Sequence, residues 1–237
     1  MRYVMSINAD RSSMLWTIAV LVALACGVDA GSPLAKAQAG TAETALAELK
    51  EGNRHHVQHR YRHPHETPTR QKSLISGQHP HAMILSCADS RVPPEIIFDQ
   101  GLGDLFAIRV AGNITDDAIL ASIEYAAEHL HTPLLVVMGH ESCGAVTAAT
   151  EAGEPPGHLS ALVKPIRPAV EKARGMPGDL VANAVRLNVE MVVAQIRDSA
   201  PLLSEMVKTG QLRVVGAVYS LENGEVRWLP EAPAGAH

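Results

Sequence analysis

The chain has 237 residues, enough for one medium-sized domain, and 46% of them are hydrophobic, enough to build a substantial core. Charged residues make up 19% and the formal net charge is −5. These values exclude a disordered or fibrous chain, and the lack of a basic stripe argues against nucleic acid as a partner.

Residues 1–30 have the pattern of a secretory signal peptide. Arg2 and Arg11 precede an apolar run from Met14 to Cys26, which has the length of a signal-peptide hydrophobic region and is short for a membrane span. We therefore expect an exported protein, periplasmic or secreted, with no stable membrane insertion once the signal is removed. An uncleaved membrane anchor and a lipoprotein attached through Cys26 are the alternatives.

Small residues after this run offer two cleavage positions. Val28-Asp29-Ala30 and Ala35-Lys36-Ala37 both fit the small-x-small pattern of signal cleavage, so we expect cleavage after Ala30 or Ala37. A single domain should then cover residues 41–237. Its two cysteines, Cys87 and Cys143, would meet an oxidising compartment, where a disulfide is one interpretation of such a pair.

The first expected element is a helix over residues 41–58. Thr41 can cap its start, and Leu46, Leu49 and Val57 fall on roughly one side of it. A histidine-rich segment follows, interpreted as solvated, irregular surface in preference to a metal-collecting tract. Its histidines are His55, His56, His59, His63 and His65.

Strands and helices then alternate along the chain. Short apolar runs without strict alternation are typical of buried parallel strands, and three are expected at residues 82–86, 105–110 and 134–138. Helices are expected at residues 116–130, 143–150 and 179–208, the last one broken by Pro201.

The end of the chain completes the predicted sheet. A fourth strand is expected at residues 211–220, and Asn223-Gly224 forms a tight turn into a last strand at residues 226–229. The alternation predicts an α/β fold: a mostly parallel central sheet of about four strands plus an antiparallel edge strand, flanked by helices. No glycine-rich loop follows a strand, so nucleotide binding is not indicated.

Metal-binding residue types stand at two of the predicted strand ends. Cys87 follows the first strand, and His140 and Cys143 follow the third, three residues apart at a strand-to-helix turn. Ligands of parallel α/β folds gather at the carboxyl ends of strands, and thiolate with imidazole suits zinc. Two cysteines and one histidine leave a tetrahedral position open, as in catalytic zinc sites. For either cysteine alone, an ordinary buried core residue is the alternative.

The segments Cys87-Ala88-Asp89-Ser90-Arg91 and His140-Glu141-Ser142-Cys143-Gly144 resemble the two signature segments of β-class carbonic anhydrases, and the resemblance extends over about residues 45–229. It implies one Zn²⁺ per chain on Cys87, His140 and Cys143. It also implies a catalytic dyad: Arg91 holds Asp89 away from the metal, and Asp89 orients the zinc-bound hydroxide that attacks carbon dioxide. In some members the aspartate itself becomes the fourth zinc ligand.

Other positions resemble the family's substrate pocket. Gln78 matches the glutamine that donates to bicarbonate or carbon dioxide. Phe106 and Tyr125 match aromatic residues that wall the pocket near a dimer seam, and Gly144 of the second segment is assigned to the same pocket. Because such a pocket is walled from both chains, the resemblance implies a homodimer or a higher even oligomer.

The function implied is the zinc-dependent, reversible hydration of carbon dioxide to bicarbonate and a proton. An exported thiol–disulfide protein is one alternative, but it leaves Asp89, Arg91 and His140 unexplained. A non-catalytic zinc-binding relative is another, against which every expected catalytic residue is present. One departure concerns inhibition: Ile84 stands where members with a non-catalytic bicarbonate site carry tryptophan, although Arg109 matches that site's arginine.

Overall fold

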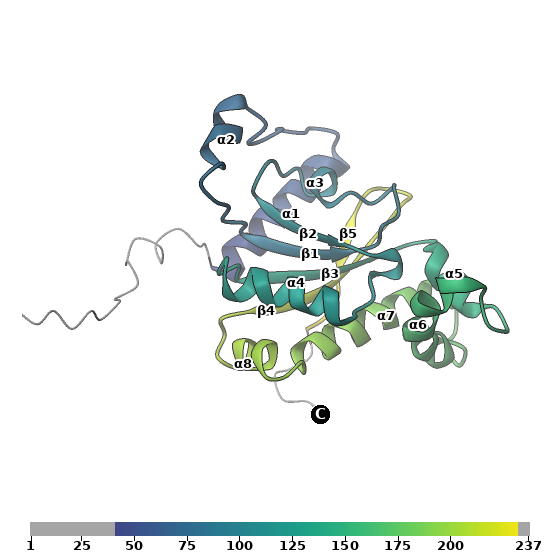
Figure 1. Ribbon diagram of the computed structural model, residues 1–237. Helices are drawn as coiled ribbons and strands as arrows, with labels where there is room; N and C mark the ends of the chain where they lie inside the picture. The colour runs from purple at the N-terminus through teal and green to yellow at the C-terminus, as the bar shows by residue number, and fades with distance from the viewer. Residues whose placement is uncertain (1–40, 232–237) are drawn as a thin grey trace, which may run out of the picture.

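The computed structural model describes residues 41–231, so the predicted signal peptide and its cleavage positions lie outside the described residues. A five-stranded sheet in the order β2-β1-β3-β4-β5 runs through the centre, with helices on both sides (Figure 1). The first four strands are parallel, and β5 is antiparallel to β4. Their bounds are β1 Ala82–Ser86, β2 Leu105–Arg109, β3 Leu134–His140, β4 Arg213–Tyr219 and β5 Val226–Trp228.

The central strands are apolar because both of their faces are covered. Every residue of β1 and β3 is buried, which explains why these strands show continuous apolar runs in place of alternation. The edge strand β2 is only partly buried. The predicted α/β fold with a mostly parallel sheet and an antiparallel edge strand is therefore confirmed.

Helices cover the two faces of the sheet. On one face α1 packs against β1 and β3, and α7 packs against β3 and β4 on the other. Gly139 and Gly216 let α7 approach closely, because a Cβ on either would lie within 3 Å of the Val189 side chain. The bounds are α1 Ala42–Val57, α2 Pro68–Ser73, α3 Pro94–Ile97, α4 Asp117–Glu128, α5 Gly144–Thr150, α6 Ser160–Ala173, α7 Leu180–Arg197 and α8 Leu202–Lys208, with 3₁₀ turns η1 Ala111–Asn113 and η2 Gly157–Leu159.

Several boundaries and environments differ from the sequence predictions. The third strand continues two residues beyond the predicted end at Met138, because Gly139 and His140 still pair with β4. The break predicted at Pro201 in the helical stretch of residues 179–208 is confirmed, since α7 and α8 lie on either side of that proline. Val57 was expected on the packed side of α1 but is 38% exposed, because it is the last residue of that helix. Within residues 41–231, no helix is both long and apolar enough to cross a membrane.

Candidate metal centre

Three potential metal ligands converge where β1 and β3 end. Cys87 directly follows β1, His140 is the last residue of β3, and Cys143 is the N-cap of α5. Their ligand atoms all lie within 4.8 Å of one another, and all three residues are buried. The parallel pairing of β1 with β3 brings the two carboxyl ends to the same edge of the sheet. In the part of the chain that the structure describes, this is the only such group of three.

The geometry and chemistry of this group fit zinc. The Cys87 and Cys143 sulfurs are 4.0 Å apart, close to the roughly 3.8 Å that two sulfurs take on a tetrahedral zinc with Zn–S of about 2.3 Å. His140 Nδ1 donates to the Glu141 carbonyl oxygen at 2.9 Å, which leaves Nε2 deprotonated and able to ligate. That Nε2 is buried and has no hydrogen-bond partner, as expected of an atom that is a metal ligand.

The two thiols are electrostatically suited to a divalent cation. A hydrogen bond from the Cys143 thiol, together with the Gly112 backbone N–H, lowers the pKa of Cys87. The same hydrogen bond to Cys87, with burial, raises the pKa of Cys143. Because thiolate is the form that binds metal, a cation bound at this pair would displace the thiol protons.

Backbone and side-chain donors hold Cys87 in place from two further segments. The Gly112 N–H lies 3.3 Å from Cys87 Sγ, and Asn188 of α7 fixes that turn by donating to the Gly112 carbonyl at 2.9 Å. Arg109 at the end of β2 donates to the carbonyls of Cys87 and Asp89 at 3.1 and 2.5 Å. Sequence reasoning did not assign these supporting roles, although Arg109 had been matched to the family's non-catalytic bicarbonate site.

Asp89 lies beside the metal-binding group but is held by Arg91. Arg91 Nε donates to Asp89 Oδ1 at 2.9 Å and its Nη2 donates to Oδ2 at 2.7 Å, and the Arg91 backbone N–H also reaches Oδ1. These bonds hold the pKa of Asp89 well below its usual range. Asp89 Oδ2 is 3.8 Å from His140 Nε2, yet Asp89 does not join the group of three ligands. Within residues 41–231, no fourth protein side chain joins the group of three ligands.

Comparisons with known proteins agree with this arrangement. A sequence model of the carbonic anhydrase family matches residues 82–226. Carbonic anhydrase 2 of Mycobacterium tuberculosis is 43% identical over 180 residues, covering 74% of this chain and 87% of that protein. The carbonic anhydrase of Mycolicibacterium smegmatis is 40% identical over 182 residues, covering 75% and 88%. The chain belongs to the carbonic anhydrase family.

Solved structures place this carbonic anhydrase in the β class. A tetrameric β-carbonic anhydrase of the filamentous ascomycete Sordaria macrospora matches with a TM-score of 0.65 and 27% identity, covering 81% of this chain and all of that one. A β-carbonic anhydrase of the fungal pathogen Aspergillus fumigatus matches with a TM-score of 0.63 and 30% identity, covering 80% and 91%. The resemblance seen in the two signature segments is thus confirmed.

The residues matched to the β-carbonic anhydrase substrate pocket are spread over the chain. Gly144 opens α5 beside Cys143 and faces open space, since a Cβ there would meet no atom within 4 Å. Gln78 lies exposed in the segment before β1. Phe106 on β2 stacks obliquely with Tyr125 on α4, with ring centroids 6.2 Å apart, and Tyr125 is 47% exposed. Within residues 41–231, no hydrogen bond or ring contact joins Gln78, Phe106 or Tyr125 to the metal ligands.

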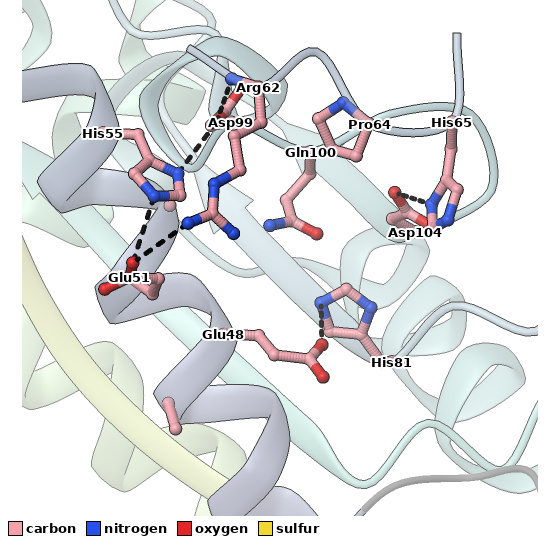
Figure 2. A pocket seen from close by; sticks show the side chains of 12 residues that line it. Glu48, Glu51, His55, Arg62, Pro64, His65, His81, Asp99, Gln100 and Asp104 are labelled. Carbon is pink, nitrogen blue, oxygen red and sulfur yellow. Dashed lines mark hydrogen bonds and ion pairs between the residues drawn. The ribbon is translucent and has the colours of Figure 1, made fainter. Parts of the chain in front are cut away.

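The histidine-rich segment lies at a different cavity. This cavity, of about 440 Å³, is bounded by α1 and by the segment around Arg62–His65 (Figure 2). Its histidines are paired with carboxylates: His55 Nδ1 lies 3.0 Å from Asp99, and His65 Nδ1 lies 2.7 Å from Asp104. His55 is 7% exposed, so describing the whole segment as solvated was wrong for this residue. Its packing against Asp99, which also accepts from the Arg62 backbone N–H, ties the segment to the fold.

Proposed function

We propose that this β-carbonic anhydrase is an exported homodimer or higher even oligomer that holds one zinc per chain. It catalyses the zinc-dependent, reversible hydration of carbon dioxide to bicarbonate and a proton. The observation that carries the mechanism is the buried group Cys87, His140 and Cys143 beside a carboxylate that an arginine holds out of the ligand set. A catalytic zinc site differs from a structural one by such an open position.

Cys87, His140 and Cys143 would hold the metal. Zinc, when bound, supplies a hydroxide nucleophile at neutral pH by lowering the pKa of water to about 7. The residues of the chain bind the metal and orient the attacking oxygen. The Cys₂His set brings two negative charges to a buried place, and the N–H donors around Cys87 stabilise one of them.

Asp89 is proposed to accept a hydrogen bond from the attacking oxygen and so to orient it. Its lowered pKa keeps it a carboxylate, which can only accept. A proton on the attacking oxygen is therefore directed toward Asp89, and a lone pair is directed toward carbon dioxide. Arg91 occupies the carboxylate with a two-pronged grip and keeps it from becoming a ligand itself.

A second copy of the chain is proposed to complete the substrate pocket. Phe106 lies on the edge strand β2, three residues before its end, and therefore about 10 Å below the edge that carries the metal group. Gln78 and Tyr125 are exposed, and within residues 41–231 no hydrogen bond or ring contact joins them to that group. Light scattering after size exclusion should give a mass of two chains or a multiple of two, and a monomer with full activity would contradict the shared pocket.

The central experiment measures zinc content and carbon dioxide hydration on the same preparation. We expect about one zinc per chain by elemental analysis, and loss of hydration on chelation with recovery on added zinc. Activity in a metal-free preparation would overturn the zinc mechanism. A zinc-loaded but inactive chain would support the non-catalytic relative. A Cys87–Cys143 disulfide in the active preparation would support the thiol–disulfide alternative; both cysteines are free in the structure.

Export is proposed from the pattern of residues 1–30. N-terminal sequencing of protein from the cell envelope should begin at Gly31 or Gln38. Soluble cytoplasmic protein that retains Met1 would refute export. A membrane-retained chain that begins at a lipid-modified Cys26 would favour the lipoprotein alternative.

A further inference from the structure

The residue after the proposed zinc ligand His140 is anchored to the β4–β5 hairpin. Glu141 Oε2 accepts from Ser220 Oγ at 2.8 Å and from the Leu221 N–H at 3.2 Å. Glu141 Oε1 accepts from Arg227 Nη2 at 2.5 Å. The Glu141 N–H also donates to the Tyr219 carbonyl at 3.0 Å. One residue therefore ties the end of β3 to the end of β4 through its backbone and to the hairpin through its side chain.

This anchor acts directly on the imidazole of His140. The Glu141 carbonyl oxygen accepts the His140 Nδ1–H at 2.9 Å, so the direction of that carbonyl sets the ring orientation and presents Nε2 to the two sulfurs. The next residue, Ser142, has a φ of +51°, a left-handed conformation that non-glycine residues adopt only when the surroundings hold them there. The Glu141 carbonyl lies between the proposed ligand His140 and this left-handed residue. The hydrogen bonds of Glu141 to Tyr219, Ser220 and Leu221 hold it in position.

The hairpin that receives Glu141 is itself rigidly held. Asn53 of α1 is buried, donates to the Gly224 carbonyl at 2.9 Å and accepts from the Val226 N–H at 2.9 Å. The Ser220 N–H donates to the Glu225 carbonyl at 2.8 Å, which closes the turn. The two donors to Glu141 Oε2, Ser220 Oγ and the Leu221 N–H, therefore lie on a hairpin that is hydrogen-bonded to α1.

We propose that Glu141 is a positioning residue for the zinc ligand His140, acting through its hydrogen bonds to Ser220 and Leu221. This inference rests on the proposed zinc function. The ion pair with Arg227 contributes less, because the Arg227 side chain is 58% exposed and solvent screens it. Ser220, in contrast, is 4% exposed, so its hydroxyl depends on Glu141 for a partner.

Three variants separate these contributions. Glu141→Ala removes both hydrogen bonds and the ion pair. Glu141→Gln keeps an oxygen for Ser220 and Leu221 but loses the charge. Glu190→Ala is the matched control, because Glu190 also pairs with an arginine at 2.5 Å, Arg186, but makes no bond to the β3 end. The measurements are zinc affinity by competition with a chromophoric chelator, the visible absorption bands of the Co²⁺-substituted protein, and thermal unfolding of the metal-free protein.

Glu141→Ala should weaken zinc binding about 10- to 100-fold and shift the Co²⁺ bands, since the ring would no longer be held. Glu141→Gln and Glu190→Ala should stay within about threefold of the parent with unchanged bands, because each keeps the anchor. Parent-like affinity and bands in Glu141→Ala would overturn the inference, as would an equal loss in Glu190→Ala.

Two further outcomes keep the test decisive. If Glu141→Ala does not fold without metal, Ser220→Ala removes one anchoring hydrogen bond alone and should weaken zinc binding measurably, whereas parent-like affinity would overturn the inference. A parent protein that binds no zinc would instead contradict the proposed function. A parent that binds zinc beside an unaffected Glu141→Ala variant would contradict this inference alone.

Discussion

Replacing Gly112 with alanine should damage the turn that supports Cys87. Gly112 has a φ of +74°, and a Cβ there would lie 2.6 Å from Ile166 Cδ1 and 3.1 Å from Ala145 Cβ. Ile166 is fully buried, so its terminal methyl has little room to move, and the Ala145 methyl cannot rotate away; the surrounding side chains or the backbone must shift. The left-handed conformation costs alanine about 1–2 kcal/mol, and overpacking adds about 1–3 kcal/mol. The sum predicts about 2–5 kcal/mol of lost stability.

The Gly157→Ala variant is the control for this estimate. Gly157 has a φ of +58° but no heavy atom within 4 Å of a new Cβ, so only the conformational cost of about 1–2 kcal/mol remains. Urea unfolding of the metal-free proteins measures both changes. Because the Gly112 N–H donates to Cys87 Sγ, Gly112→Ala should also weaken zinc binding about tenfold, while Gly157→Ala should not. If Gly112→Ala and Gly157→Ala lost the same free energy of unfolding and both kept the zinc affinity of the parent, this account would be refuted.

Three other substitutions test separate parts of the molecule. Cys143→Ser should lose zinc and hydration activity together, because a hydroxyl is a poor substitute for a thiolate, and elemental analysis beside the hydration assay checks this. Asp89→Ala should retain zinc through the remaining ligands but lose most of the hydration rate; loss of zinc as well would mean that Asp89 has a structural role. Asn53→Ala should lower the free energy of unfolding by about 2–4 kcal/mol, because the partly buried Gly224 carbonyl and the buried Val226 N–H lose their partner, and a change below about 1 kcal/mol in urea unfolding would contradict this.

The central strands could be predicted from sequence because buried parallel strands consist of continuous apolar residues. The bounds of β1 were predicted correctly, since Ala82–Ser86 is a continuous apolar run with polar neighbours. The end of β3 was placed two residues early, because Gly139 and His140 are not strand-like residues and are held by pairing with β4. Helix α6 was not predicted, because Pro165 and Pro168 indicate a break; both lie away from the buried side of that helix.

The metal group could be predicted because it depends on short-range features. Cys87 and His140 stand at the ends of apolar strands, and parallel strands bring those ends together. The supports could not be predicted, since the bond from Asn188 to Gly112 spans 76 positions and depends on how α7 packs. Gln78, Phe106 and Tyr125 illustrate a different limit: within residues 41–231 no hydrogen bond or ring contact joins them to the metal ligands, and their assignment to the pocket stays a prediction.

Arg91→Lys tests whether geometry or charge at Asp89 matters. The lysine ammonium cannot reproduce the two parallel bonds from Nε and Nη2, although the backbone N–H of residue 91 still reaches Asp89 Oδ1. The oxygen released is Oδ2, the one 3.8 Å from His140 Nε2, so the carboxylate gains freedom toward the ligand group. We expect zinc content to be retained and the hydration rate to fall about 10- to 100-fold. Arg174→Lys, which alters an exposed arginine paired with Glu171, is the control.

The pH dependence distinguishes this loss from a change in ionisation. Arg91 lowers the pKa of Asp89, so its loss lets that pKa rise toward about 3.9, still below the assay range of about pH 6 to 9. Asp89 therefore stays a carboxylate in both proteins, and the fold-loss in rate should be the same at each pH. Because the pKa of Asp89 is lower in the folded chain than in the unfolded one, its stabilising contribution is present above about pH 4 and is lost as the pH falls further. The difference in unfolding temperature between parent and Arg91→Lys should thus be constant above about pH 6 and shrink below about pH 4. A rate loss confined to the acid side of the assay range would show that Arg91 acts on ionisation, and a variant equal to the parent at every pH would make Arg91 a packing residue.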